Sequence, residues 1–409
     1  MDILIEEFEG KVWAAALRKG RLEGLEIDPP HEAVRWGAVY RAKITRIDKS
    51  LDAAFLDLDG TNTGILYNRD IVIKQKDGSY LKGGDTSIGK NLKAGDIIIV
   101  QAKSAYLSSD DDLFQQSEED KTVQTTMSIS IPGRYLIYTP MLSNNQVSRR
   151  IRGKERRKKL EKMLNQIEGM SGLILRSAGA DLQTDILMRE AKILKDTWNV
   201  ISHSLEGTAV ELLIQGPNSI QRVLSDMAIE TIDTIKITTM DHFHQAEDWC
   251  NIFAPDLVTK IEPVEVDDGT QDLALFEHED LMGQIEALFY NYVLLPSGGN
   301  LIIQSTAALT AVDINKSSDK RSHLAVNIEA VHELARQMRL RNCGGIIIVD
   351  FLKMNSKKDK DALLEALEDA TYTDPCTVQV HGLTRLGLAE ITRKRRTPPL
   401  AERFEGIEF

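Results

Sequence analysis

The sequence predicts a multidomain α+β protein, and three observations lead to this prediction. The chain has 409 residues, of which 42% are hydrophobic, and this is more than one compact core holds. Its first third reads as short alternating strands. Its last third alternates longer apolar strands with helices. We therefore expect two to four domains, with a small barrel near the N-terminus and a layered α/β domain near the C-terminus.

The barrel is predicted from short segments in which apolar and polar residues alternate between turn residues. These segments are Lys11–Arg18, Ala38–Ile47, Ala53–Leu58, Thr63–Leu66 and Ile97–Ala102. Residues 104–122 are polar and acidic without a period, which predicts a mobile loop. The middle of the chain predicts helices at residues 153–169, 184–203 and 218–227 and a strand at 210–215.

The C-terminal third shows the clearest periodicity. Apolar positions 324, 328, 331, 334, 335 and 338 have helical spacing, and Gly344 and Gly345 end that helix. A second helix is predicted at 358–371. The strands are predicted at 300–304, 308–313, 346–349, 377–381 and 385–393.

Charge is distributed unevenly along this acidic chain. The net charge is −12, which taken alone argues against a nucleic-acid ligand. Residues 149–162, however, hold nine Lys/Arg against two Glu, and residues 393–396 form a second basic run. The ordinary explanation of one such run is a solvated helix face. Two of them in an acidic protein raise the case for a polyanion partner only modestly.

Localisation is predicted from what the sequence lacks. No apolar run has the length of a bilayer span, and the first residues lack the basic start and apolar core of a signal peptide. Three scattered cysteines, Cys250, Cys343 and Cys376, suggest neither a disulfide framework nor a zinc ribbon. We therefore expect a cytoplasmic protein that does not contact a membrane.

Two carboxylates follow two apolar strands. Asp313 comes after Ala-Leu-Thr-Ala-Val and Asp350 after Ile-Ile-Ile-Val. Ligands bind at the carboxyl ends of strands in α/β sheets, and two convergent carboxylates suit Mg²⁺. Asn315, two residues after Asp313, would face the same side and could hold that carboxylate. The alternative is that each aspartate is a turn former or helix N-cap.

Three further motifs have plainer explanations. Residues 84–91 nearly match a phosphate-binding loop, but the last position is Asn91 rather than Ser or Thr, which favours a Gly-rich barrel loop. His242, His244 and Cys250 lack a second cluster at zinc spacing, so we interpret the histidines as structural or surface residues. Phe55 is either a core residue or a platform for base stacking on the barrel.

Several of these segments resemble the ribonuclease E/G family. Residues 295–299, 305–315, 335–341 and 344–351 resemble its catalytic segment, residues 43–55 its OB-type barrel, and residues 148–151 and 172–179 its 5′-sensor. The resemblance runs in order from about residue 30 to 400. It implies a ribonuclease H-like domain (residues 1–34 and 207–279), an inserted OB-fold barrel (35–128), a 5′-sensor domain (129–206), a deoxyribonuclease I-like α/β catalytic domain (280–400) and a tail (401–409).

The resemblance also implies a function and a set of site residues. The chain would be an endoribonuclease that uses Mg²⁺ to cut single-stranded RNA, such as rRNA precursors and mRNA, to 5′-phosphate and 3′-hydroxyl ends. Asp313 and Asp350 would hold Mg²⁺, and Asn315 would orient Asp313. Arg176 and Ser177 would grip the 5′-monophosphate of preferred substrates. The implied RNA contacts are Phe55, Ile65, Lys121, Arg149, Arg150 and Arg385.

The sequence departs from the family pattern at several positions. Ser177 stands where the family usually has Thr, and Ile65 stands where it has a second aromatic residue, so we expect weaker sensing and stacking. The family's zinc-binding cysteine pair is missing, so we expect no zinc site, and the oligomeric state stays open. The alternative function is a weakly active or inactive RNA-binding or ribosome-assembly protein. Nucleotide hydrolysis at residues 84–91 is disfavoured by Asn91.

Overall fold

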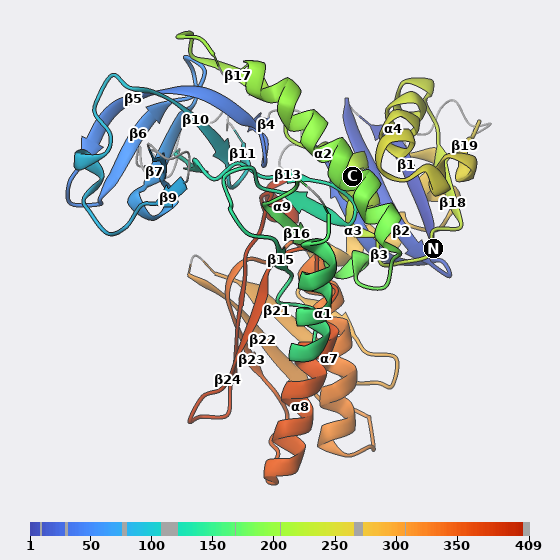
Figure 1. The fold of residues 1–409 in the computed structure, drawn as a ribbon. Coiled ribbons are helices and arrows are strands. Elements are labelled where there is room, and N and C mark those ends of the chain that lie inside the picture. The colour runs from blue at the N-terminus through green and yellow to red at the C-terminus, as the bar shows by residue number, and fades with distance from the viewer. Residues whose placement is uncertain are drawn as a thin grey trace. The chain divides into compact units, whose positions relative to one another are not determined.

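The computed structural model describes residues 1–8, 10–28, 32–75, 80–107, 122–167, 169–204, 206–265, 273–306 and 308–403 (Figure 1). The chain divides into two compact units. The first contains Met1–Pro29, Ile232–His242 and Glu262–Phe409, and the second contains Pro30–Thr231 and Phe243–Ile261. Across the described ranges, no helix is both long and apolar enough to cross a membrane.

A five-stranded sheet begins the first unit. β1 (Asp2–Phe8), β2 (Lys11–Arg18) and β3 (Arg21–Ile27) form an antiparallel meander, which β18 (Thr234–Ile237) and β19 (Ile261–Pro263) extend beyond β1. Trp13 is fully buried and packs edge-on against Phe276, with ring centroids 6.2 Å apart. The same core includes residues of the short helices α5 (Ala274–His278), α6 (Met282–Glu286) and η5 (Ala287–Phe289).

The first unit also contains a six-stranded sheet. Its strand order is β20-β21-β22-β23-β25-β24, and β22 and β23 are its only parallel neighbours. The strands are β20 (Tyr292–Leu294), β21 (Asn300–Ser305), β22 (Leu309–Asn315), β23 (Gly345–Asp350), β24 (Val378–Leu383) and β25 (Ala389–Arg393). The helices are α7 (His323–Leu340), α8 (Lys357–Ala370) and α9 (Leu400–Arg403).

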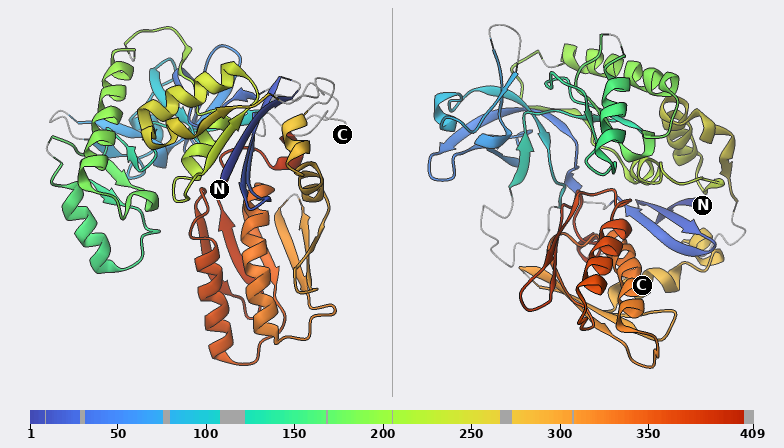
Figure 2. Two further views of the ribbon diagram at one scale, coloured as in Figure 1. Left: turned by 90° about the vertical axis from the view of Figure 1, so that its right-hand side faces the viewer. Right: turned by 60° about the horizontal axis from the view of Figure 1, so that its bottom comes forward.

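Helices α7 and α8 cover one face of this sheet (Figure 2). Val312, Ile314, Ile347 and Val349 point into the core beneath these helices. Because successive side chains of a strand point to opposite faces, the residues between them lie on the uncovered face. The alternation that predicted these strands therefore also separates core residues from the candidate site.

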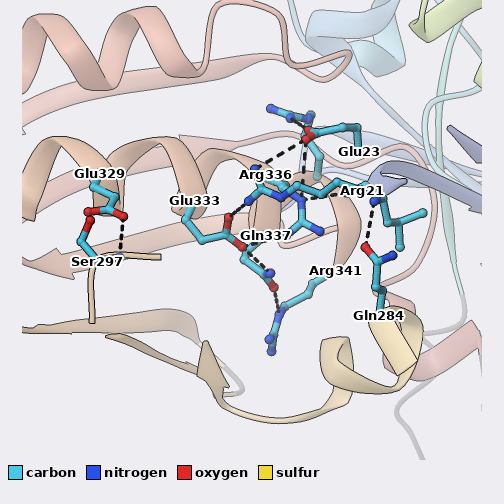
Figure 3. Close-up of polar contacts among 11 residues, drawn as sticks. Arg21, Glu23, Gln284, Ser297, Glu329, Glu333, Arg336, Gln337 and Arg341 are labelled. Carbon is cyan, nitrogen blue, oxygen red and sulfur yellow. Dashed lines mark hydrogen bonds and ion pairs between the residues drawn. The ribbon is translucent and has the colours of Figure 1, made fainter. Parts of the chain in front are cut away.

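Polar contacts tie α7 to strand β3 (Figure 3). Arg336 donates through Nε to the Leu22 carbonyl oxygen at 2.7 Å and through Nη1 to Glu333 at 2.8 Å. Arg21 pairs with the other oxygen of Glu333, and the Leu22 amide donates to Gln284 at 2.9 Å. These contacts fix the helix that connects β22 to β23.

The second unit contains a closed five-stranded barrel. β10 pairs with both β12 and β5, so the series β5, β6, β7, β12 and β10 closes without a free edge. Ile44, Leu56, Leu66 and Val100 lie in its core. The strands are β5 (Val39–Asp48), β6 (Ala53–Asp57), β7 (Thr63–Tyr67), β10 (Ile97–Ala102) and β12 (Val123–Thr126), and β17 (Glu211–Ile214) adds to β5.

A four-stranded sheet with two helices follows the barrel. Its order is β13 (Ile131–Pro132), β14 (Leu136–Tyr138), β16 (Leu173–Leu175) and β15 (Gln146–Val147). Helices α1 (Lys154–Leu164) and α2 (Thr184–Ser204) contribute Leu160, Leu164, Leu187 and Leu194 to the core of this sheet. A 3₁₀ turn, η3 (Ser177–Gly179), follows β16.

Smaller elements complete the described residues. Two short strand pairs are β4 (Glu32–Val34) with β11 (Tyr106–Leu107) and β8 (Val72–Lys74) with β9 (Tyr80–Lys82). The remaining helical elements are α3 (Ser219–Asp226), α4 (Met240–Phe253), η1 (Asn68–Asp70), η2 (Ile88–Lys90) and η4 (Pro255–Lys260). The mixed α/β fold and the small barrel are thus confirmed. The assignment of Lys11–Arg18 to the barrel is wrong, because this strand pairs with β1 and β3 in the five-stranded sheet. The ribonuclease H-like and deoxyribonuclease I-like assignments and the domain boundaries stay predictions.

Candidate active site

Asp313 and Asp350 lie side by side on the uncovered face of the six-stranded sheet. They are register partners in the parallel pair β22–β23, and the Cα atoms of such neighbours are about 4.8 Å apart. Both side chains are exposed. The structure therefore brings together the two carboxylates that the sequence singled out. Their spacing along the chain could not show whether they lie close together.

Asp313 lies within its strand rather than after it. β22 continues to Asn315 because Ile314 is buried in the core and Asn315 pairs in register with Asn300 of β21. Asn315 consequently lies two residues further along the same face, as expected. Its Nδ2 donates to Oδ2 of Asp313 at 2.9 Å and to Oδ1 of Asn300 at 3.4 Å.

The chain beyond Asp350 is held by a buried asparagine that sequence reasoning missed. Asn327 of α7 is fully buried, and its side-chain amide bonds both backbone groups of Leu352. It accepts from the Leu352 amide at 3.0 Å and donates to the Leu352 carbonyl oxygen at 2.9 Å. Asn327 therefore fixes the path of the backbone two residues after Asp350. Its signal in the sequence is only an amide at a core position of a predicted helix.

The donor set of the acid pair fits a hard divalent cation. Among the described residues, no Lys or Arg pairs with either carboxylate, so no described cation neutralises either charge. Asn315 occupies only one oxygen of Asp313, which leaves the other available as a ligand. No group of three or more His, Cys, Asp or Glu side chains suited to a metal occurs in the described ranges. Two carboxylates with several waters is the usual coordination of Mg²⁺.

Arg385 lies in the turn of the β24–β25 hairpin, beside the end of β23. Ala389 pairs with Val349, the residue before Asp350, and also with Leu383 on the other arm of the hairpin. The Thr384 amide donates to the Leu388 carbonyl oxygen at 2.8 Å and closes the turn. The exposed Arg385 side chain thus leaves the sheet at the same end as the acid pair.

An exposed tyrosine that sequence reasoning missed shares the row of the acid pair. Tyr292 pairs with Ile302, Ile302 pairs with Asp313, and Asp313 pairs with Asp350. Directly paired residues point to the same face of a sheet, and the Tyr292 side chain is 52% exposed. The row therefore ends in an aromatic surface two strands away from Asp313.

Comparison with known proteins assigns the chain to a family. The sequence model of the ribonuclease E/G family matches residues 130–396, which include Asp313, Asn315 and Asp350. The chain belongs to the ribonuclease E/G family. It is 31% identical to ribonuclease E of Haemophilus influenzae over 395 residues and 33% identical to ribonuclease E of Escherichia coli over 400 residues. It is 29% identical to ribonuclease G of Salmonella typhimurium over 406 residues.

The matched region covers different shares of these relatives' lengths. It covers 93% of this chain but only 40% of the Haemophilus and 35% of the Escherichia ribonuclease E. For the Salmonella ribonuclease G it covers 96% of this chain and 80% of the relative. The chain therefore spans less than half the length of the Haemophilus and Escherichia ribonuclease E proteins.

The sensor residue that the ribonuclease E/G resemblance indicated, Arg176, is held by protein partners in this member. Its Nη1 donates to the Ser225 hydroxyl at 2.7 Å and to the Gly133 carbonyl oxygen at 2.8 Å. The carboxylate of Asp226 lies 4.0 Å from Nη2. Ser177 follows as the first residue of η3. These internal contacts come from residues far along the chain, and nothing in the sequence indicated them.

A buried carboxylate holds the segment to which Arg176 binds. Glu190 of α2 accepts from the backbone amides of Arg134, Tyr135 and Leu136, at 3.0 Å from Tyr135 and 2.9 Å from Leu136. Burial raises the pKa of Glu190 to about 7, although the amide donors and Arg176 lower it. The Tyr135 carbonyl oxygen in turn accepts from the Arg176 amide at 2.8 Å. Glu190 therefore supports the backbone that Arg176 contacts.

An arginine lies over Phe55, the barrel residue for which the resemblance implies base stacking. Phe55 and Ile65 are cross-strand partners and form a small cluster apart from the main barrel core. Phe55 is 6% exposed, since it packs in this cluster and the Arg46 guanidinium lies over its ring at 3.8 Å from the centroid. Tyr67, two residues after Ile65 on the same strand, packs against this cluster and is an aromatic neighbour that sequence reasoning missed. Strand alternation could have identified it.

The other RNA contacts implied by the resemblance are only partly placed. Arg149 is exposed and Arg150 half-buried, immediately after β15. Lys121 and the acidic residues 108–120 lie outside the described residues.

The structure also describes the two motifs for which the sequence favoured an explanation without a ligand. Residues 84–91 form a loop and the short η2 turn, and the buried His242 bonds the Thr239 hydroxyl rather than joining Cys250. Burial raises the pKa of the Cys250 thiol to about 12, as suits an inert core cysteine.

Proposed function

We propose that this protein is a Mg²⁺-dependent endoribonuclease that cuts single-stranded RNA, including rRNA precursors and mRNA, in the cytoplasm. The register pairing of Asp313 with Asp350, with Asn315 bonded to Asp313, carries the proposal. Two exposed carboxylates without a protein cation among the described residues are poised to bind a divalent ion. The names of its relatives, ribonuclease E and ribonuclease G, support RNA as the substrate.

Each residue of the site has a distinct role in this proposal. Asp313 and Asp350 would hold Mg²⁺, which when bound supplies a nucleophilic water and charge stabilisation at the phosphate. Asn315 fixes the rotamer of Asp313 by its hydrogen bond. Arg385 offers a planar guanidinium to an RNA phosphate beside the acid pair. Hydrolysis would leave 5′-phosphate and 3′-hydroxyl ends.

Base contacts and end recognition complete the proposal. Tyr292 presents an aromatic surface on the same face as the acid pair, and base–aromatic stacking tolerates any sequence. Phe55 and Ile65 would contact RNA after Arg46 moves from the Phe55 ring. Arg176 and Ser177 would bind a 5′-monophosphate, which would compete with Asp226 for the guanidinium.

Cleavage of a 5′-monophosphorylated, AU-rich oligoribonucleotide tests the activity. We expect cleavage with Mg²⁺, none with EDTA, and recovery when Mg²⁺ is restored. The downstream fragment should carry a 5′-phosphate and the upstream fragment a 3′-hydroxyl. If the chain binds this RNA without cutting it under varied metals and sequences, the RNA-binding or ribosome-assembly alternative is correct.

The end preference is tested separately with Arg176→Ala. This variant should lose more activity on 5′-monophosphorylated RNA than on 5′-hydroxyl RNA, because only the former offers a charged ligand to the guanidinium. Arg189→Ala, which removes another arginine of the same unit, serves as the control. Equal losses on both RNAs for Arg176→Ala would remove the sensor assignment.

A further inference from the structure

Helix α1 carries a stripe of lysines. Lys154, Lys158 and Lys162 are exposed and spaced four residues apart, so they lie along one face of the helix. The opposite face buries Leu160 and Leu164. At 1.5 Å per residue, the stripe is roughly 12 Å long. We call Lys154, Lys158 and Lys162 the α1 lysine stripe.

The stripe is poorly neutralised by the protein. Lys158 lies 3.4 Å from Glu155, but both side chains are largely exposed, and such a surface pair contributes little. No carboxylate pairs with Lys154 or Lys162 among the described residues. The exposed Glu161 also lies on this face, three residues after Lys158. The three lysines and two glutamates of the face therefore leave one excess positive charge on a chain whose net charge is −12.

The N-terminal end of α1 lies beside the sensor residues. β15 and β16 are parallel neighbours with Val147 opposite Leu175, so the chain leaves both strands at the same edge, toward Arg149 and Arg176. Arg156 in the first turn of α1 pairs with Asp181 at 2.6 Å, four residues after Ser177. The N-terminal turn of α1, where the stripe begins, therefore lies near the segment that follows the sensor residues.

We propose that the α1 lysine stripe binds backbone phosphates of single-stranded RNA downstream of a 5′ end held at Arg176 and Ser177. The proposal rests on the sensor role proposed above and extends it from one terminal phosphate to the following nucleotides. A row of ammonium groups at regular spacing complements a polyanion without reading its sequence. The stripe would strengthen binding of any 5′-monophosphorylated strand, whatever its bases.

The test compares two triple variants of the full chain. In one, Lys154, Lys158 and Lys162 are all changed to Gln. In the control, the three exposed lysines at the start of α8, Lys357, Lys358 and Lys360, are changed to Gln. The two variants lose the same charge, and Gln keeps a helix propensity close to that of Lys. Circular dichroism checks that both fold.

Binding is measured by fluorescence anisotropy over a salt series with a 5′-monophosphorylated oligoribonucleotide, in EDTA so that the RNA is not cut. Each phosphate contact contributes about 0.7 to the slope of log K against log salt for single strands, so the α1 variant should lose roughly 2 from that slope. The α8 variant should keep the wild-type slope. A 5′-hydroxyl oligonucleotide should show a smaller loss in the α1 variant, because its end is not fixed at Arg176.

Three outcomes would overturn the proposal. Equal slopes in all three proteins would show that the stripe does not contact RNA. Equal losses in both triple variants would show an effect of net charge alone, and equal α1 losses on both oligonucleotides would separate the stripe from the sensor. If wild type still binds and cuts RNA in these cases, only this inference fails. If wild type binds no RNA, the proposed function fails with it.

Discussion

The buried carboxylate of Glu190 makes the stability of the second unit depend on pH near neutrality. Its side chain is enclosed by the backbone amides of Arg134, Tyr135 and Leu136, and its residue is 4% exposed. Burial raises its pKa from 4.5 to about 7. The folded protein therefore binds more protons than the unfolded chain between these two values, and stability falls as pH rises through them.

The size of this effect follows from the shift. A difference of about 2.5 pKa units at about 1.4 kcal/mol each corresponds to roughly 3 kcal/mol. This stabilisation is fully present below pH 4.5 and lost as pH rises through about 7. Glu190→Gln removes the titration while it keeps the side-chain size. The amide also turns one acceptor into a donor facing backbone amides, which costs about 1–3 kcal/mol at every pH.

Urea unfolding of wild type and Glu190→Gln, followed by circular dichroism between about pH 4.5 and pH 8, measures the effect. Other titrating groups are common to both proteins and cancel in the difference. We expect the stability of wild type relative to the variant to fall by roughly 3 kcal/mol as pH rises over this range. A difference that stays constant with pH, or rises with it, would refute the assigned pKa and the role of burial.

Three further substitutions test other parts of the structure. Asn315→Ala should lower the cleavage rate about 10- to 100-fold with little effect on folding, because Asp313 loses the hydrogen bond that orients it; an unchanged rate would contradict this. Arg393→Met should lower the free energy of unfolding by about 3–5 kcal/mol, since it leaves the buried Asp374 carboxylate without its 2.9 Å partner; urea unfolding measures it, and a loss below about 1 kcal/mol would contradict it. Tyr292→Ala should raise KM for RNA several-fold while kcat changes little, and kinetics that match wild type would exclude stacking there.

The regular elements near the acid pair could be predicted from the sequence. Apolar spacing located α7, and the apolar run before Asp350 located β23, because burial on one or both faces imposes these periods. The same alternation placed Asn315 on the face of Asp313. Local patterns contain this information because it depends on residues only a few positions apart.

Long-range features could not be predicted in this way. The pairing of Asp313 with Asp350 depends on a strand register set across the whole of α7. The Arg46 guanidinium over Phe55 depends on a cross-strand pair, and the contact of Arg176 with Ser225 joins residues 49 positions apart. Polar contacts of this kind leave no period in the sequence, so only the structure shows which side chains are already engaged.

The central claim is that Asp313 and Asp350 act together to cut RNA. Its most direct test is the single-turnover cleavage rate of Asp313→Asn and Asp350→Asn at saturating RNA and Mg²⁺. Asp361→Asn, which alters an exposed carboxylate of α8, serves as the matched control. Each site variant should stay folded, bind RNA and lose about a thousandfold in rate, while the control keeps wild-type activity. If either site variant cuts RNA at a rate near that of the control, the acid pair is not the catalytic centre.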